Sequence, residues 1–123
     1  MPILRLIALR CNRQEDWTGD DDTYITINGT KFWGPKKFDD RQSRTINKDH
    51  QFANRAEVRL YEYDTDSDDD FLGSHEVLRD EAGGGEKKIN FSNSGASYDL
   101  WYIVYPDQPA IAASAIKALM NKA

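Results

Sequence analysis

The stretch VRLYEYDTDSDDDFLG, residues 58–73, changes character halfway along its length. Its first part alternates apolar and polar residues, which is typical of a half-buried β-strand. The chain then places six carboxylates between residues 62 and 70 before an apolar residue returns at Phe71. Carboxylates this close together repel one another, so the segment raises the question of what neutralises them.

A second segment, residues 15–22, concentrates acidic residues in the same way. It contains Glu15, Asp16, Asp20, Asp21 and Asp22. Residues 15–22 and 62–70 together hold 11 of the 21 acidic residues, whereas all 16 Lys and Arg residues lie outside these two ranges. The acidic balance, and the absence of a basic motif with interleaved aromatic residues, argue against a nucleic-acid partner.

The length of 123 residues fits one domain with a hydrophobic core of its own. Cys11 is the only cysteine, which excludes an internal disulfide and a CxxC metal or redox site. Residues 1–11 alternate and carry Arg5 and Arg10, so they favour a strand over a signal peptide. We expect a cytoplasmic protein, or one exported without a classical signal peptide, and no transmembrane segment.

Short runs of β-branched, aromatic and alternating residues predict eight strands. They are residues 3–10, 23–27, 30–33, 44–52, 56–63, 71–78, 87–91 and 97–105. Asn28-Gly29 is a strong hairpin signal, and Gly34-Pro35 opens a predicted loop over residues 34–43. This spacing predicts an all-β fold, an eight-stranded antiparallel β-sandwich over residues 1–106. We expect four large apolar residues in its core: Phe71, Leu72, Trp33 and Trp101.

Residues 107–123 predict a C-terminal amphipathic α-helix that begins near Asp107 and Pro109. Its apolar face comprises Ile111, Ala115, Ile116, Leu119 and Met120. We expect the helix to pack on the sandwich or to extend from it toward a partner, and the oligomeric state stays open.

Antiparallel strands also predict where the acidic segments lie. If successive strands run in opposite directions, the loops after the first, third and fifth strands share one end of the sandwich. These loops contain residues 15–22, the pair Asp39-Asp40, and residues 64–70. Carboxylates that are distant in the sequence are therefore expected to converge in space.

Convergent carboxylates favour calcium, which takes roughly 6 to 8 oxygen ligands in irregular geometry. Zinc prefers His and Cys, and only His50 and His75 accompany the single cysteine. An EF-hand starting at Asp64 is excluded, because its sixth position is Asp69 instead of Gly and its twelfth is His75 instead of Glu.

The two acidic segments resemble the first and third calcium loops of C2 domains. The first match is EDWTGDDDTYITI, residues 15–27, and the second is residues 58–73. The resemblance implies a C2-like sandwich with calcium ligands at Asp16, Asp22, Glu62, Asp64 and Asp70. A single strand before the first loop is similar to the circularly permuted topology of the family, in which the last strand completes the sheet.

Two departures from the family pattern accompany the match. Glu62 stands where the family usually has Asp, and the Asn-Pro-x-Trp-Asn-Glu type of segment is missing. Asp66 at the tip of the third loop is a further candidate ligand. Asp39 and Asp40 are candidates from a second loop, or they form a solvated turn offset by neighbouring basic residues.

The resemblance implies calcium-dependent docking to anionic phospholipid headgroups. Trp17 and Phe38 are candidates for insertion between headgroups, and Lys36 and Lys37 for attraction to them. The alternative is a protein-interaction module in which calcium only stabilises the fold and membranes are not bound. We expect no enzymatic activity, because the sequence contains no nucleophile elbow, Cys/His pair or phosphate-binding Gly loop.

Overall fold

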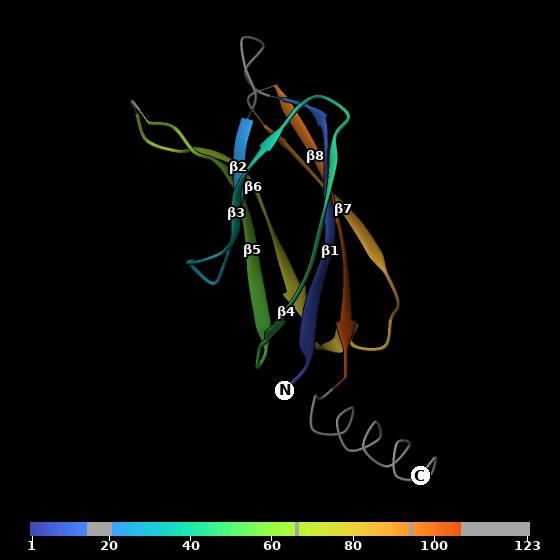
Figure 1. The fold of residues 1–123 in the computed structure, drawn as a ribbon. Helices are drawn as coiled ribbons and strands as arrows, with labels where there is room; N and C mark the ends of the chain where they lie inside the picture. Colours follow the sequence, from blue (N-terminus) through green and yellow to red (C-terminus); the bar gives the residue numbers. More distant parts are fainter. Residues whose placement is uncertain (15–20, 66, 94, 107–123) are drawn as a thin grey trace, which may run out of the picture.

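The computed structural model describes residues 1–14, 21–65, 67–93 and 95–106, which form two packed β-sheets (Figure 1). The strands are β1 (Ile3–Arg13), β2 (Asp21–Ile27), β3 (Thr30–Phe38), β4 (Ser43–Gln51), β5 (Arg55–Glu62), β6 (Asp70–Leu78), β7 (Lys87–Asn93) and β8 (Ala96–Tyr105), with a short 3-10 helix at Arg79–Glu81. The predicted all-β, eight-stranded antiparallel fold is therefore confirmed. The C-terminal helix predicted for residues 107–123 lies outside the described residues.

The strand order shows how the chain is wound. One sheet has the order β4-β1-β8-β7 and the other β3-β2-β5-β6. The last strand, β8, pairs with the first along most of its length, from Ile3 opposite Tyr105 to Arg13 opposite Ser97. This pairing is the one expected for the permuted topology.

Alternate residues of both sheets fill the space between them. On β1 the side chains of Leu4, Leu6 and Leu9 are fully buried, and on β8 those of Tyr98 and Leu100 are. Two hydroxyl groups also meet in this interior, those of Thr23 and Tyr98, at 3.0 Å. The core thus follows the period-2 pattern of the strands, and the contact between Thr23 and Tyr98 joins the two sheets in the interior.

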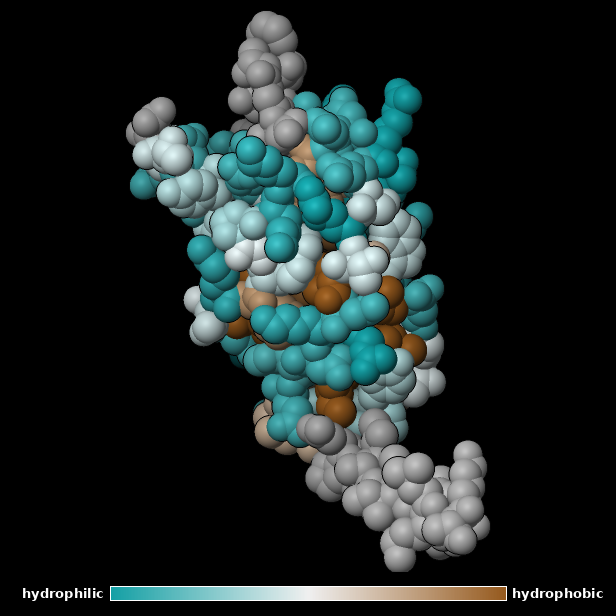
Figure 2. All heavy atoms as spheres, viewed as in Figure 1, coloured by the Kyte–Doolittle hydropathy of each residue, from teal (hydrophilic) through white to brown (hydrophobic). Residues whose placement is uncertain are grey.

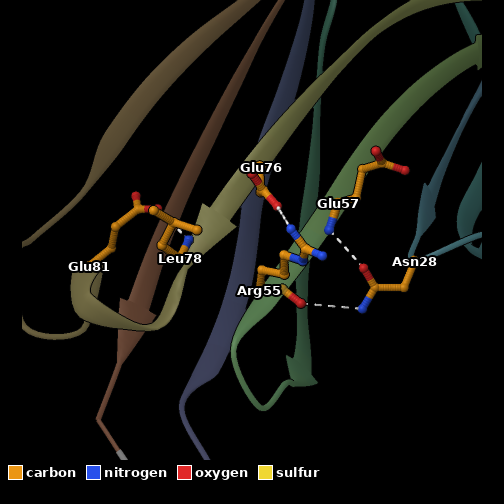
Figure 3. Close-up of polar contacts among 6 residues, drawn as sticks. All are labelled: Asn28, Arg55, Glu57, Glu76, Leu78 and Glu81. Carbon is orange, nitrogen blue, oxygen red and sulfur yellow. Dashed lines mark hydrogen bonds and ion pairs between the residues drawn. The ribbon is translucent and has the colours of Figure 1, made fainter.

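The hairpin between β2 and β3 turns at Asn28-Gly29, as predicted. Both residues have positive φ, 50° and 84°, which suits the tight turn that joins right-twisted strands. The Asn28 side chain also braces β5: its Oδ1 accepts from Glu57 N at 2.8 Å, and its Nδ2 donates to Arg55 O at 3.5 Å (Figure 3). The turn therefore lies against the end of β5 opposite to the acidic loops.

Of the loop predicted over residues 34–43, residues 34–38 belong to a strand and residues 39–42 form the turn. β3 continues through Gly34 and Pro35 as far as Phe38, because these two residues form a bulge opposite Tyr24. Gly34 has φ of 88°, and a Cβ there would lie 2.6 Å from Thr23 O, so a glycine is required. β3 is an edge strand, where the missing N–H of proline is tolerated.

Side chains bridge the two open sides of the sandwich. On one side, Lys48 Nζ donates to Phe32 O at 2.7 Å and Arg44 Nε donates to Lys37 O at 2.6 Å, so β4 is joined to β3. On the other side, Asn93 Nδ2 donates to Phe71 O at 2.8 Å, so β7 is joined to β6. At the end of β6, the Glu81 carboxylate accepts locally from Leu78 N (Figure 3). The backbone groups that these side chains satisfy on the two edge strands are Phe32 O, Lys37 O, Phe71 O and Leu78 N.

The strand directions bring the predicted acidic loops to one end of the sandwich. Glu62 at the end of β5 is opposite Asp70 at the start of β6, so the chain turns at this end of the sandwich. Asp21 at the start of β2 is opposite Phe38, so β3 ends at this end of the sandwich as well. Backbone bonds between Cys11 and residues 41 and 42 place the 39–42 turn at the end of β1. In Figure 1 this end is uppermost. None of the helices in the described part of the chain has the length and hydrophobicity to span a membrane.

Candidate metal site at the acidic end

Glu62 and Asp70 form the fixed part of the candidate site. They are direct cross-strand partners, at the last residue of β5 and the first of β6. Since Leu60 and Leu72 point into the core, strand alternation places Glu62 and Asp70 on the same face, at the mouth of the sandwich. Two half-buried carboxylates are thus held side by side by the sheet itself.

Asp22 lies one strand away on the same end of the sheet. Its neighbour Thr23 is opposite Glu62 in the ladder between β2 and β5. The carbonyl oxygen of Asp22 accepts a hydrogen bond from Tyr63 N at 2.7 Å, which fixes the chain as it leaves β5. Asp22, Glu62 and Asp70 therefore come from three adjacent strands, and their backbone positions are set by sheet pairing.

The loop between β5 and β6 is closed by Asp69. Its Oδ1 accepts from Asp64 N at 3.0 Å, and its Oδ2 accepts from the hydroxyl of Tyr24. The Asp64 carboxylate accepts from Ser67 Oγ at 2.8 Å. The bond from Tyr24 holds the pKa of Asp69 below its usual value, and burial raises the pKa of Tyr24. The sequence does not indicate that Asp69 closes the loop, because each acidic residue in this run has a carboxylate that could accept the same hydrogen bonds.

Tyr24 belongs to an aromatic row on the outer face of the sheet. Its ring stacks on Tyr61 with centroids 5.3 Å apart, and Tyr61 contacts Phe71 at 5.6 Å. Lys31 Nζ lies 4.6 Å from the Tyr24 ring centroid, and the Arg59 guanidinium lies 5.4 Å from that of Phe71. Phe71 is 41% exposed, so the expectation that it belongs to the core is wrong.

Asp39 and Asp40 occupy an exposed turn on the side of β1. Asp40 Oδ1 accepts from Gln14 N at 2.8 Å, and Asp39 N donates to Gln42 Oε1 at 3.0 Å. Arg41 N donates to Cys11 O. The turn is therefore at the predicted end of the sandwich, where its Asp40 carboxylate holds the chain beyond β1.

The remaining predicted ligands, Asp16 and Asp66, lie outside the described residues, as does Trp17. Within residues 1–14, 21–65, 67–93 and 95–106, no three Asp, Glu, His or Cys side chains come close enough together to hold a metal ion. The sheet brings Asp22, Glu62 and Asp70 to neighbouring positions without forming a closed cage.

The donor chemistry at this end fits a hard cation. The candidate side chains are carboxylates, whereas the two histidines are engaged elsewhere. His75 Nε2 lies 3.2 Å from the Tyr102 hydroxyl, and the His50 ring packs on Phe32. Carboxylate oxygens suit calcium, while a zinc site would need nitrogen or sulfur ligands.

The candidate docking residues differ in their exposure. Lys36 and Lys37 are exposed on β3, next to the acidic end. Phe38 is fully buried, with its ring 5.7 Å from that of Tyr98, so it cannot insert into a membrane without leaving the core. Tyr63, which the sequence analysis missed, is 43% exposed directly after Glu62. The acidic end is otherwise covered largely by hydrophilic residues (Figure 2).

The arrangement of strands is similar to that of solved C2 domains. A structure described as a C2 domain matches with a TM-score of 0.56 and 17% identity over 85% of this chain and 99% of that one. A C2 domain of plant extended synaptotagmin 1 matches with a TM-score of 0.51 and 13% identity over 87% and 95% of the two chains. The chain therefore has the C2-domain fold.

Human GIVD cytosolic phospholipase A2 gives a match with a TM-score of 0.55 and 20% identity. That match covers 87% of this chain but only 16% of the phospholipase chain. A scan of the sequence against protein-family models gives no match, and neither does a search of curated proteins. At these identities, the likeness establishes the fold and leaves the activity to the residues themselves.

Proposed function

We propose that this C2-like module binds calcium at its acidic end and then docks on anionic phospholipid. The observation that carries the proposal is the placement of Asp22, Glu62 and Asp70 on three adjacent strands at one end of the sheet. Sheet pairing holds the backbone of these three residues in place, so the ordering that a cation requires falls mainly on their side chains. The C2 fold supports the same assignment.

The first step concerns charge at the acidic end. Without a cation, the carboxylates of this end repel one another and repel an anionic membrane. Asp22, Glu62 and Asp70 would hold the ion, with Asp64 as a further ligand when it releases Ser67. Bound calcium supplies positive charge and coordination positions that accept oxygen.

The second step concerns the surface around the site. Lys36 and Lys37 are exposed on β3 and each adds attraction of about 1 kcal/mol near an anionic surface. Tyr63 offers an exposed aromatic ring of the kind that is enriched at membrane interfaces. Because Phe38 is buried and the end is hydrophilic, we expect binding to be mainly electrostatic and to weaken as salt is added.

The experiment is sedimentation of the full chain with vesicles of phosphatidylcholine and phosphatidylserine, in calcium, in magnesium and in chelator. We expect sedimentation in calcium only, and none with vesicles of phosphatidylcholine alone. Replacing Lys36 and Lys37 with Gln should reduce vesicle binding without changing the calcium-induced rise in melting temperature. Vesicle binding that is equal in calcium and in chelator would contradict the proposal.

The second candidate function is a protein-interaction module that calcium only stabilises. It is favoured by the burial of Phe38, which removes one of the two side chains expected to insert into lipid. A ligand at about 100 times its dissociation constant adds roughly 2.7 kcal/mol to the stability of the folded state. A melting temperature that rises in calcium, without vesicle binding, would select this candidate. We assign no catalytic reaction under either of the two candidate functions.

A further inference from the structure

The C-terminal half of β8 carries apolar residues on both of its faces. Its inward-facing residues are buried in the core: Leu100, Tyr102 and Val104. Its outward-facing residues alternate with them: Trp101, Ile103 and Tyr105. An antiparallel sheet with one face in water normally places polar residues outward, as the first half of β8 does with Ser97 and Asp99. The pattern therefore changes at Trp101 from a solvated outer face to an apolar one.

The neighbouring strand extends this apolar surface. Ala8 on β1 is opposite Trp101, and Ile3 is opposite Tyr105. We call the half-buried residues Ala8, Trp101, Ile103 and Tyr105 the outer patch. The partly buried hydrophobic residues that pack against the core are different ones: Phe32, Trp33, Ile46, Ala82 and Ile89. The outer patch is thus a separate surface on the far side of the sheet.

Two cationic side chains flank the outer patch, one on each neighbouring strand. Lys88 Nζ lies 6.0 Å from the ring centroid of Trp101, and the Arg5 guanidinium lies 5.1 Å from that of Tyr105. Arg5 is also paired with Asp49 at 2.7 Å. Apolar surface with a charged rim is typical of a binding surface.

We propose that residues 107–123 of the same chain dock on the outer patch as an amphipathic helix. The chain leaves β8 at Tyr105, which is itself part of the patch, and this segment follows after Pro106. Its apolar positions 111, 115, 116, 119 and 120 fall on one helical face. This docking requires neither calcium nor lipid.

The lengths of the two elements agree. A helix of about 14 residues is roughly 21 Å long. The strand from Asp99 to Tyr105 has a length of roughly 20 Å at about 3.3 Å per residue. A helix that runs back along β8 would bring its second half, with Lys117 and Lys122, beside the outward-facing Asp99. The short connection gives the segment an effective concentration of about millimolar at this surface, which favours it over a second copy in dilute solution.

The test is hydrogen–deuterium exchange of the full chain, followed in peptides that cover residues 107–123. We expect amides of residues 111–120 to exchange at least about tenfold more slowly than in an unstructured peptide. Replacing Ile103 with Ser changes only the patch and should abolish this protection. Replacing Ile116 and Leu119 with Ser changes only the segment and should do the same, without any risk to the sandwich core.

The matched control is Phe71→Ser, which removes an exposed aromatic ring from the outer face of the other sheet. It should leave the exchange of residues 111–120 unchanged. Three results would overturn the inference: exchange of the wild-type segment at the unstructured rate, protection that Ile103→Ser does not affect, and protection that appears only with dimers in sedimentation or only with added phosphatidylserine vesicles.

Discussion

The hydroxyl of Tyr24 on β2 donates a hydrogen bond to the carboxylate of Asp69, which closes the loop between β5 and β6. The same ring stacks on Tyr61 and lies under Lys31. The aromatic row on the outer face of the sheet is therefore connected to the acidic loop through one phenol group. The conformation of that loop depends on a residue outside it.

Replacing Tyr24 with Phe tests this connection. The variant keeps the stacked ring and removes the donor to Asp69, so we expect a loss of about 1 kcal/mol in the free energy of unfolding. Amides of residues 64–69 should exchange faster with solvent. Tyr61→Phe is the control, since Tyr61 keeps its place in the row and its hydroxyl accepts from Arg59 Nη1 at 3.3 Å. An equal effect of the two variants would contradict the role given to Tyr24.

The Tyr24 bond also predicts a dependence on pH. It holds the pKa of Asp69 below its usual value, so it stabilises the folded state at pH values above the unfolded pKa of about 3.9. This contribution is lost as the pH falls through the lower pKa of the folded state. Chemical denaturation from neutral pH to about pH 3 should show a difference between wild type and Tyr24→Phe that is constant at first and then shrinks. If the difference in the free energy of unfolding between the two proteins grows on acidification, the Tyr24 bond does not lower the pKa of Asp69.

The candidate ligands predict a ranking of calcium affinities. Replacing Asp70 with Asn, or Glu62 with Gln, keeps the shape of the side chain and removes a charge at a position fixed by the sheet. We expect calcium binding to weaken by about an order of magnitude or more, because the number of charged ligands tunes affinity over several decades. Isothermal titration of the variants measures the effect.

Asp68→Asn provides the matched control for that ranking. It removes the same charge from the same loop, but Asp68 is exposed beyond the strand ends. The calcium affinity of Asp68→Asn should fall less, relative to wild type, than the calcium affinity of Asp70→Asn. In chelator the melting temperatures of the variants should no longer follow this order. If Asp68→Asn loses as much affinity as Asp70→Asn, the ligand positions implied by the C2 resemblance do not apply to this chain.

Gly73 predicts a steric effect on the packing of the two sheets. It has φ of 152°, and a Cβ there would lie 2.7 Å from the Phe91 ring on β7. Gly73→Ala should therefore lower the free energy of unfolding by about 1–3 kcal/mol, as overpacking does. In a Phe91→Leu background the same change should cost less, and thermal melts of the four chains measure this coupling. The exposed neighbour Ser74→Ala is the control and should be neutral.

The strands were predictable because one face of each sheet is buried and the period-2 pattern follows from that burial. The exceptions arise where neighbouring residues compete for the buried face. In Phe71-Leu72-Gly73 the core takes Leu72 and leaves Phe71 exposed, since the pairing of Glu62 with Asp70 fixes the alternation. Gly34-Pro35 signals a turn, yet on an edge strand it forms a bulge and lets β3 reach Phe38.

The candidate site was predictable in its location and less so in its contacts. The alternating directions of the strands alone predict that Asp22, Glu62 and Asp70 lie at one end of the sandwich. Strand directions contain no information on side-chain partners. They therefore do not predict the hydrogen bond between Tyr24 and Asp69 or the one between Ser67 and Asp64. The position of Tyr63 is readable from the sequence, because it follows the alternating residues of the β5 segment directly after Glu62.

The side chains that bridge the open sides of the sandwich have a consequence for the chain at high concentration. Lys48, Arg44 and Asn93 occupy carbonyl oxygens on the edge strands β3 and β6, which are groups that the strand of another molecule would use to extend the sheet. These residues therefore protect against aggregation. Substitutions at these three positions should change the stability of a dilute monomer little. At high concentration, the carbonyl oxygens that they leave unoccupied would be a template for the growth of cross-β aggregates.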